Sequence, residues 1–173
     1  MHLSKVAYKA SDDSLLDQEI QTFVFEPNYT PAMEDYYAIG SVLYRITKSY
    51  DSAAIYFQRA FDTLPPDTPL ELRRVITDQL AMSYGISGQL KQSRAVNESA
   101  IKTDPDYPLY YYNLACADAE QGHVANAKLH LQQAYDRKAN VIPGEKFPDP
   151  TKDDSILKLK KNKEFWAFVE TLK

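Results

Sequence analysis

The sequence is poor in the residues that build many common functional sites. Cys116 is its only cysteine, so the chain can form neither an internal disulfide nor a zinc site of several thiolates. A lone thiol fits a reducing compartment. Only five of the 173 residues are glycines, and no GxGxxG, P-loop or GxSxG motif is present. The sequence therefore gives no sign of a nucleotide site or of a serine hydrolase.

Basic residues and long apolar runs are also scarce. The formal net charge is −4 and the sequence pI is near 5.4, which argues against a nucleic-acid-binding protein. No apolar run approaches the roughly 18 residues of a membrane span. Residues 1–10 lack the apolar stretch of a signal peptide. We therefore expect a cytoplasmic protein, or a periplasmic one if a signal peptide was removed before this numbering begins.

What the sequence does contain is an internal repeat. Residues 34–67, 74–107 and 108–141 each read as two helices joined by a tight turn. The turns fall near Lys48, at Gly88 and at Gly122. The second and third repeats are offset by 34 residues and the first two by 40, with the extra residues in the proline-rich stretch 65–72. The pattern predicts an all-α protein, because both halves of every repeat have helical periodicity.

Small and large residues recur at fixed places in the three repeats. In the first repeat these are Tyr37, Gly40, Tyr44, Tyr50, Ala53, Phe57, Ala60 and Pro65. In the second they are Leu80, Ala81, Tyr84, Gly88, Ala100 and Pro105, and in the third Tyr111, Leu114, Ala115, Gly122, Ala127, Leu131 and Ala134. Four positions depart from the pattern: Ser93, Asn97, Asp118 and Ala139. Small residues let helices approach closely, and large ones fill the remaining gaps.

This pattern resembles the tetratricopeptide-repeat (TPR) family over residues 34–141. The resemblance implies a right-handed superhelical solenoid of helix-turn-helix repeats, used as an adaptor or scaffold in protein–protein interaction. The acidic start and Glu-Phe pair near the C-terminus are similar to the tails of many bacterial members. We therefore expect a bacterial-type TPR protein with three repeats.

The flanks are expected to cover the ends of the solenoid. Residues 1–33 hold one candidate helix, 11–25, which either covers the first repeat or belongs to a mobile acidic arm. Residues 142–173 read as a loop and two capping helices, with Asp153, Asp154 and Ser155 as candidate caps of the first and Asn162 as the cap of the second. A lysine run at 158, 160, 161 and 163 is read as a solvated helix face in preference to a site for an acidic partner.

No catalytic or metal-binding constellation emerges from the sequence. His123 and His130 share the third repeat, but no third ligand follows their spacing. Cys116 lies between two alanines with no local histidine to activate it, so we expect a packed or groove-facing thiol. We predict no enzyme activity, no metal and no cofactor.

The resemblance places a peptide groove on the concave face, which the first helix of each repeat lines. By helical phase the groove residues are Asp35, Ala38, Val42 and Arg45, then Val75, Asp78, Met82 and Ile86, then Leu109, Tyr112, Asn113, Cys116 and Glu120. Asn113 either bonds a ligand backbone or has a packing role. Because Tyr111 takes the core position, Tyr110 or Tyr112 is expected to be exposed.

These features predict a non-catalytic module that binds a peptide or protein of unknown identity. The alternative is a structural, self-associating TPR protein that uses an exposed end or its convex face. A chaperone tail held by a carboxylate clamp is disfavoured, because Ala38, Val42, Leu109 and Asn113 occupy the clamp positions. We expect a monomer or a weak homodimer.

Overall fold

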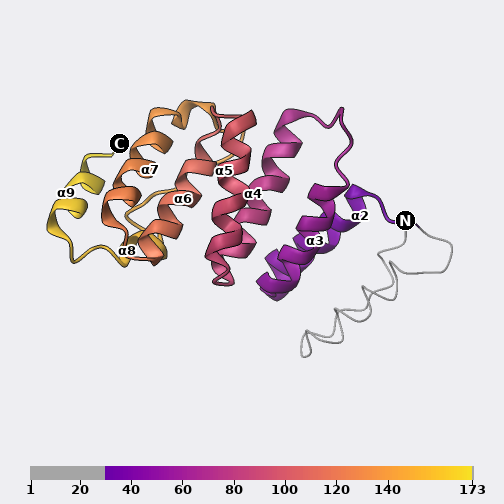
Figure 1. The fold of residues 1–173 in the computed structure, drawn as a ribbon, viewed down its shortest axis with the longest axis horizontal. Helices are drawn as coiled ribbons and strands as arrows, with labels where there is room; N and C mark the ends of the chain where they lie inside the picture. The colour runs from indigo at the N-terminus through magenta and orange to yellow at the C-terminus, as the bar shows by residue number, and fades with distance from the viewer. Residues whose placement is uncertain (1–29, 173) are drawn as a thin grey trace. The chain divides into compact units, whose positions relative to one another are not determined.

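A computed structural model describes residues 30–172, and every regular element in that range is a helix (Figure 1). The expected helix at residues 11–25 lies outside the described residues. The chain divides into two compact units, Met1–Thr68 and Pro69–Lys173. Each unit is described by itself.

The described part of unit 1, residues 30–68, is a helical hairpin. It consists of α2 (Met33–Val42), a π-helical turn η2 (Leu43–Thr47) and α3 (Tyr50–Asp62). The predicted turn is present: Lys48 adopts the left-handed conformation at φ 59° and ends η2. Gly40 lies against the ring of buried Phe57, so the absence of a side chain there lets the two helices approach closely.

The connection into unit 2 is shorter than the repeat pattern indicates. Helix α4 (Leu70–Ile86) begins directly after Pro69, whose carbonyl accepts a hydrogen bond from the backbone N–H of Arg73 at 3.0 Å. The predicted start of the second repeat, Arg74, therefore lies one turn inside this helix. Proline suits the entry to a helix because no N–H is needed there and its φ is fixed near helical values.

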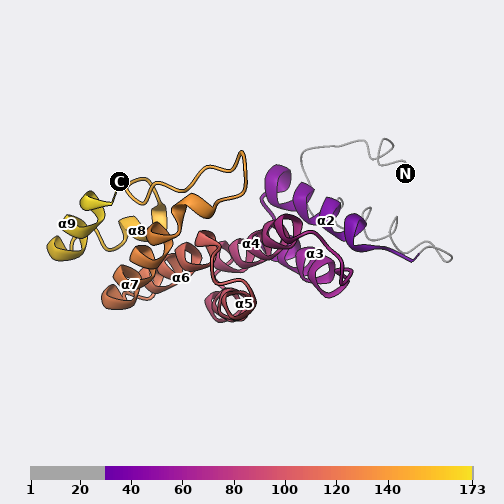
Figure 2. The ribbon, with the colours of Figure 1, turned by 90° about the horizontal axis from the view of Figure 1, so that it is seen from above.

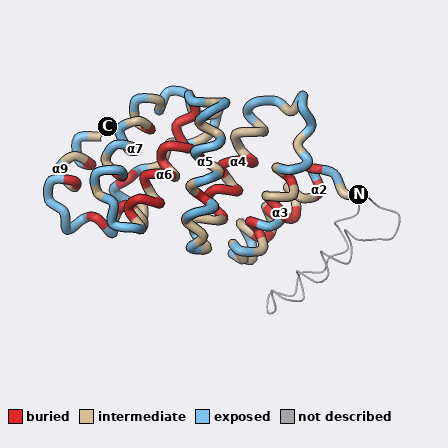
Figure 3. The backbone as a smooth tube through the Cα atoms, in the orientation of Figure 1, coloured by how far each residue is buried: buried red, intermediate tan, exposed pale blue. Residues whose placement is uncertain are grey.

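Unit 2 contains two further hairpins. Helix α4 pairs with α5 (Leu90–Thr103), and α6 (Pro108–Glu120) pairs with α7 (Val124–Asp136). The predicted turns are confirmed, since Gly88 and Gly122 have φ of 80° and 74°. Helix α6 packs against α4 and α5 as well as α7, and most of its residues are buried (Figure 3). It is the central helix of unit 2.

The chain ends in the two predicted short helices. After η3 (Lys138–Asn140) come α8 (Asp154–Leu157) and α9 (Lys163–Thr171). Of the three candidate caps of α8, Asp153 is the one used, and its side chain accepts hydrogen bonds from two backbone N–H groups; the predicted cap Asn162 of α9 accepts one. Apolar side chains of this end join the core that α6 and α7 form. They are Ile156, Leu159, Phe165 and Val169.

Candidate peptide-binding surface

The predicted groove residues of unit 1 differ in exposure. Asp35 is buried, and its carboxylate accepts a hydrogen bond from the backbone N–H of Ala32 at 2.9 Å. Ala38 and Val42 are partly buried, and Arg45 is exposed. Asp35 therefore holds the start of α2. Ala38, Val42 and Arg45 remain candidates for contact with a partner.

In unit 2 the structure brings together the predicted groove residues Asp78 and Asn113. The side-chain amide of Asn113 on α6 donates to a carboxylate oxygen of Asp78 on α4 at 2.8 Å. Behind them lies Asn97 of α5, fully buried, with its own amide donating to the carbonyl of Ser93 at 2.8 Å. Ser93 and Asn97, which depart from the repeat pattern, line the polar junction between α4, α5 and α6.

Burial also sets the charge state of this junction. The Asp78 side chain is buried, which raises its pKa to about 7; the hydrogen bond from Asn113 opposes the rise, and the nearby Glu145 carboxylate adds to it. A carboxylate with so raised a pKa changes charge near neutral pH. The predicted groove therefore carries less negative charge at Asp78 than the sequence indicates.

The remaining groove residues of α4 are more open. Val75 and Met82 are partly buried, and Ile86 at the end of the helix is 51% exposed. An isolated exposed isoleucine is common on protein surfaces. Its value here is positional, since it gives the predicted groove an accessible apolar residue.

The expectation that Tyr110 or Tyr112 is exposed is wrong. Tyr107, Tyr110, Tyr111 and Tyr112 are all buried, at 6% exposure or less. Tyr107 and Tyr110 pack edge to face at 4.9 Å, and the Tyr111 hydroxyl donates to the carbonyl of Pro105 at 2.9 Å. These contacts lie on different sides of α6, so its start can bury all four rings.

Tyr112 is buried because the chain returns over it. We call residues 141–153 the return segment. Its Phe147 lies edge-on to Tyr112, with ring centroids 5.8 Å apart, and edge-on to Tyr135 of α7 at 5.0 Å. The return segment lies on the side of α6 away from α5 (Figure 2). The sequence predicts this stretch as a loop, but not that it covers the predicted groove face of α6.

Cys116 and Glu120 also meet the C-terminal part of the chain. The Cys116 sulfur lies 3.7 Å from a carboxylate oxygen of Asp153, and Glu120 forms an ion pair with Lys158. Burial, together with the Asp153 charge, raises the pKa of the Cys116 thiol well above its usual value. The thiol is therefore protonated and a poor nucleophile at neutral pH.

The two histidines of the third repeat meet a buried acid that the sequence reading left without a role. Asp118 is fully buried and pairs with Arg94 of α5, while His130 Nδ1 lies 2.7 Å from its other carboxylate oxygen. His123 Nδ1 is 3.7 Å away. The signal was available, because an acid replaces the tyrosine of the repeat pattern. Within residues 30–172, no group of three or more His, Cys, Asp or Glu side chains could hold a metal ion.

None of the helices in the described range is both long and apolar enough to cross a membrane. No family model matches the sequence, and no curated protein matches it significantly. Among solved structures, the chain is similar to the Sgt2 TPR domain from Aspergillus fumigatus, with a TM-score of 0.56 and 18% sequence identity. The match covers 82% of this chain and 83% of that one. The chain thus has the tetratricopeptide-repeat solenoid fold.

Proposed function

We propose that this chain is a non-catalytic interaction module that binds an extended peptide or protein segment along the predicted groove faces of α4 and α6. The observation that carries the proposal is the return segment. It lies along the predicted groove face of α6 as irregular backbone, which supports the proposal that this face accepts a peptide-like chain. The protonated Cys116 thiol fits a binding role better than a catalytic one.

The face of α4 supplies contacts for such a segment. Ile86 is exposed and apolar, Val75 is partly buried, and Asn113 lies across from Asp78. The amide group of Asn113 donates to Asp78 and, more weakly at 3.5 Å, to Asn97. Both hydrogen bonds use the nitrogen, which leaves the carbonyl oxygen to accept from a partner's backbone N–H. The packing role and the ligand role of Asn113 are thus compatible.

The test compares two exposed apolar residues from the two hairpins of unit 2, one on a first helix and one on a second helix. Ile86 lies on the proposed binding face of α4, and Leu129 lies on α7, a second helix, with 51% and 55% exposure. Tagged wild-type chain, Ile86→Glu and Leu129→Glu are used to capture partners, which are quantified by mass spectrometry. We expect Ile86→Glu to lose the captured partner at least tenfold, because a buried charge at an interface has no compensation.

Leu129→Glu is the matched control and should capture as the wild type does. Both variants should melt as the wild type, since both side chains are exposed. The reverse outcome, in which only Leu129→Glu loses capture, would contradict the groove and assign binding to the second-helix face. Light scattering of the same samples shows whether the captured partner is a second copy.

A further inference from the structure

We propose that the groove face of α6 is a site for an extended peptide with an acidic side chain two residues before an aromatic one, and that the return segment occupies it as an internal ligand. This inference rests on the proposed function and names the chemistry of the segment that the surface takes. The geometry that points to it is the pairing of Glu145 with Tyr107 and of Phe147 with Tyr112.

The return segment follows α6 in register. Glu145 contacts Tyr107 just before the helix, Phe147 contacts Tyr112 in its first half, and Asp153 contacts Cys116 further along. The segment therefore runs parallel to α6. Three prolines, at 143, 148 and 150, favour extended backbone, and no helix forms between residues 141 and 153. Side-chain contacts with α6 and α7 hold it in place, as they would hold a bound peptide.

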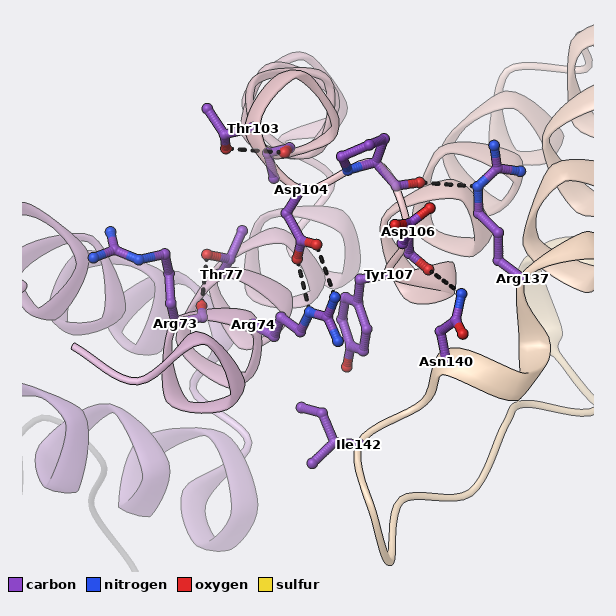
Figure 4. Close-up of polar contacts among 12 residues, drawn as sticks. Arg73, Arg74, Thr77, Thr103, Asp104, Asp106, Tyr107, Arg137, Asn140 and Ile142 are labelled. Atoms are coloured by element: carbon purple, nitrogen blue, oxygen red, sulfur yellow. Dashed lines mark hydrogen bonds and ion pairs between the residues drawn. The ribbon is translucent and has the colours of Figure 1, made fainter. Parts of the chain in front are cut away.

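At the position that takes the acidic side chain, the site offers a hydroxyl donor that is already in place. The Tyr107 hydroxyl donates to the Glu145 carboxylate, 2.9 Å from each oxygen. The Tyr107 ring lies under the guanidinium of Arg74 at 5.0 Å, and Arg74 is itself fixed by two hydrogen bonds to Asp104, at 2.7 and 2.8 Å (Figure 4). Because Arg74 and Tyr110 also hold the Tyr107 ring, its hydroxyl stays in place for another carboxylate.

At the position that takes the aromatic side chain, two tyrosine rings meet the ring of Phe147 edge to face. Phe147 meets Tyr112 and Tyr135 at interplanar angles of 79° and 88°, the edge-to-face arrangement that aromatic rings prefer. Tyr112 comes from α6 and Tyr135 from α7, so the pocket belongs to the hairpin and not to the return segment. Any phenylalanine or tyrosine presented at the same spacing from an acid would fit it.

Two features show that the internal ligand fits imperfectly. The Tyr112 hydroxyl is buried without a well-aligned hydrogen bond, and the Asp153 carboxylate is its polar neighbour. The carboxylate of Glu145 also raises the pKa of Asp78, because the two carboxylates repel when both are ionised. A partner peptide that gave the Tyr112 hydroxyl a hydrogen bond would bind better than the chain's own segment does.

Contacts at both ends of the return segment anchor the chain on either side of its exposed middle. At its start, Arg137 donates to the carbonyl of Pro105 at 2.9 Å and Asn140 donates to that of Asp106 at 3.2 Å (Figure 4). At its end, Asp153 caps α8. Gly144, at φ 87°, and Lys146 are exposed between these anchors. The part that would exchange with a partner is therefore short and bounded at both ends.

The experiment uses the full chain and a fluorescent synthetic peptide with the sequence of residues 141–153. Binding is measured by fluorescence anisotropy to wild type, to Phe147→Ala and to Lys146→Ala. We expect Phe147→Ala to bind the peptide at least tenfold more tightly than wild type, because the weakened internal ligand competes less. Lys146→Ala, an exposed change in the same segment, should bind as wild type. A peptide with alanine in place of its phenylalanine should bind at least tenfold more weakly to Phe147→Ala.

Glu145→Gln provides a second vacated site if Phe147→Ala does not fold, as judged by circular dichroism. If the peptide does not bind a folded variant, this inference is overturned. Partner capture that depends on Ile86 would still leave the proposed function standing. Conversely, if the peptide binds but Ile86→Glu captures partners as the wild type does, only the proposed binding face of α4 is contradicted. If the wild type forms dimers that the peptide dissociates, the return segment of a second copy occupies the site. The proposal that each chain's own segment occupies it would then be wrong.

Discussion

The carboxyl group of Asp78 is buried against α6, and burial raises its pKa to about 7. An aspartate in the unfolded chain has a pKa of about 4. The folded state therefore holds the proton more tightly than the unfolded state does. The stability that this proton contributes is complete below about pH 4 and is lost as the pH rises through about 7.

Asp78→Asn should remove this pH dependence, because an amide has the same shape and cannot ionise. Its oxygen can still accept the hydrogen bond from Asn113, which is 2.8 Å long in the wild type. We expect the variant's gain in unfolding free energy over wild type to be larger at pH 8 than at pH 5, by about 2 kcal/mol. Urea unfolding at both pH values measures it.

Asp106→Asn makes the same chemical change at an exposed position of unit 2 and should track the wild type at both pH values. A constant difference between Asp78→Asn and wild type across the two pH values would show that Asp78 is not the titrating group.

At this scale the sequence predicts which side of a helix a residue lies on better than it predicts the residue's spatial neighbours. It marks Asp78 and Asn113 as facing the same surface, and the structure joins them. It fails for Tyr112, which phase alone places at the surface, because burial by Phe147 depends on a chain segment 35 positions away. Asp118 illustrates the opposite case: the departure from the pattern was visible, but its partners Arg94 and His130 lie on two other helices.

At the scale of helices, two glycines on first helices have different roles. A Cβ at Gly40 would lie 2.8 Å from an atom of the Phe57 ring, which is fully buried and has Tyr37 and Tyr44 as ring neighbours. At Gly85 the nearest atom would be Ser93 Oγ at 3.5 Å, an ordinary contact. Only Gly40 is required by packing.

Gly40→Ala is therefore expected to destabilise the α2–α3 hairpin by about 1–3 kcal/mol, because the Phe57 ring has no room to move. Gly85→Ala is the matched control and should stabilise α4 by about 0.5–1 kcal/mol through its helix propensity. Urea unfolding followed by circular dichroism measures both. If the two substitutions had effects of the same sign, close packing at Gly40 would not be the reason for its glycine.

The sequence predicts helices and turns well where one residue decides the local backbone. Gly88 and Gly122 take the positive φ that tight turns need, and Asp153 and Asn162 cap the helices expected after them. The start of α4 is missed because the repeat pattern marks core positions, whereas Pro69 extends the helix one turn before them. The course of residues 141–153 is missed because no periodic pattern records contacts between an irregular segment and a helix.

At the scale of the molecule, unit 2 has a core of its own. The core cluster joins buried residues from Tyr107 to Val169, and all of them belong to Pro69–Lys173. Four large members come from the chain's end: Ile156, Leu159, Phe165 and Val169. Buried side chains of this size contribute about 1.5–3 kcal/mol each. Together they rival the roughly 5–15 kcal/mol by which whole domains are stable.

Two fragments follow from this core. Residues 69–173 should melt in one cooperative transition by circular dichroism, because they contain the entire cluster. Residues 69–140 keep all four long helices of unit 2 but lack these four apolar side chains, and should melt without a cooperative transition. If residues 69–140 melted as sharply as residues 69–173, the last two helices would add little to the core, and their role as a cap on the solenoid would be contradicted. The comparison therefore separates a capping end from an appended one.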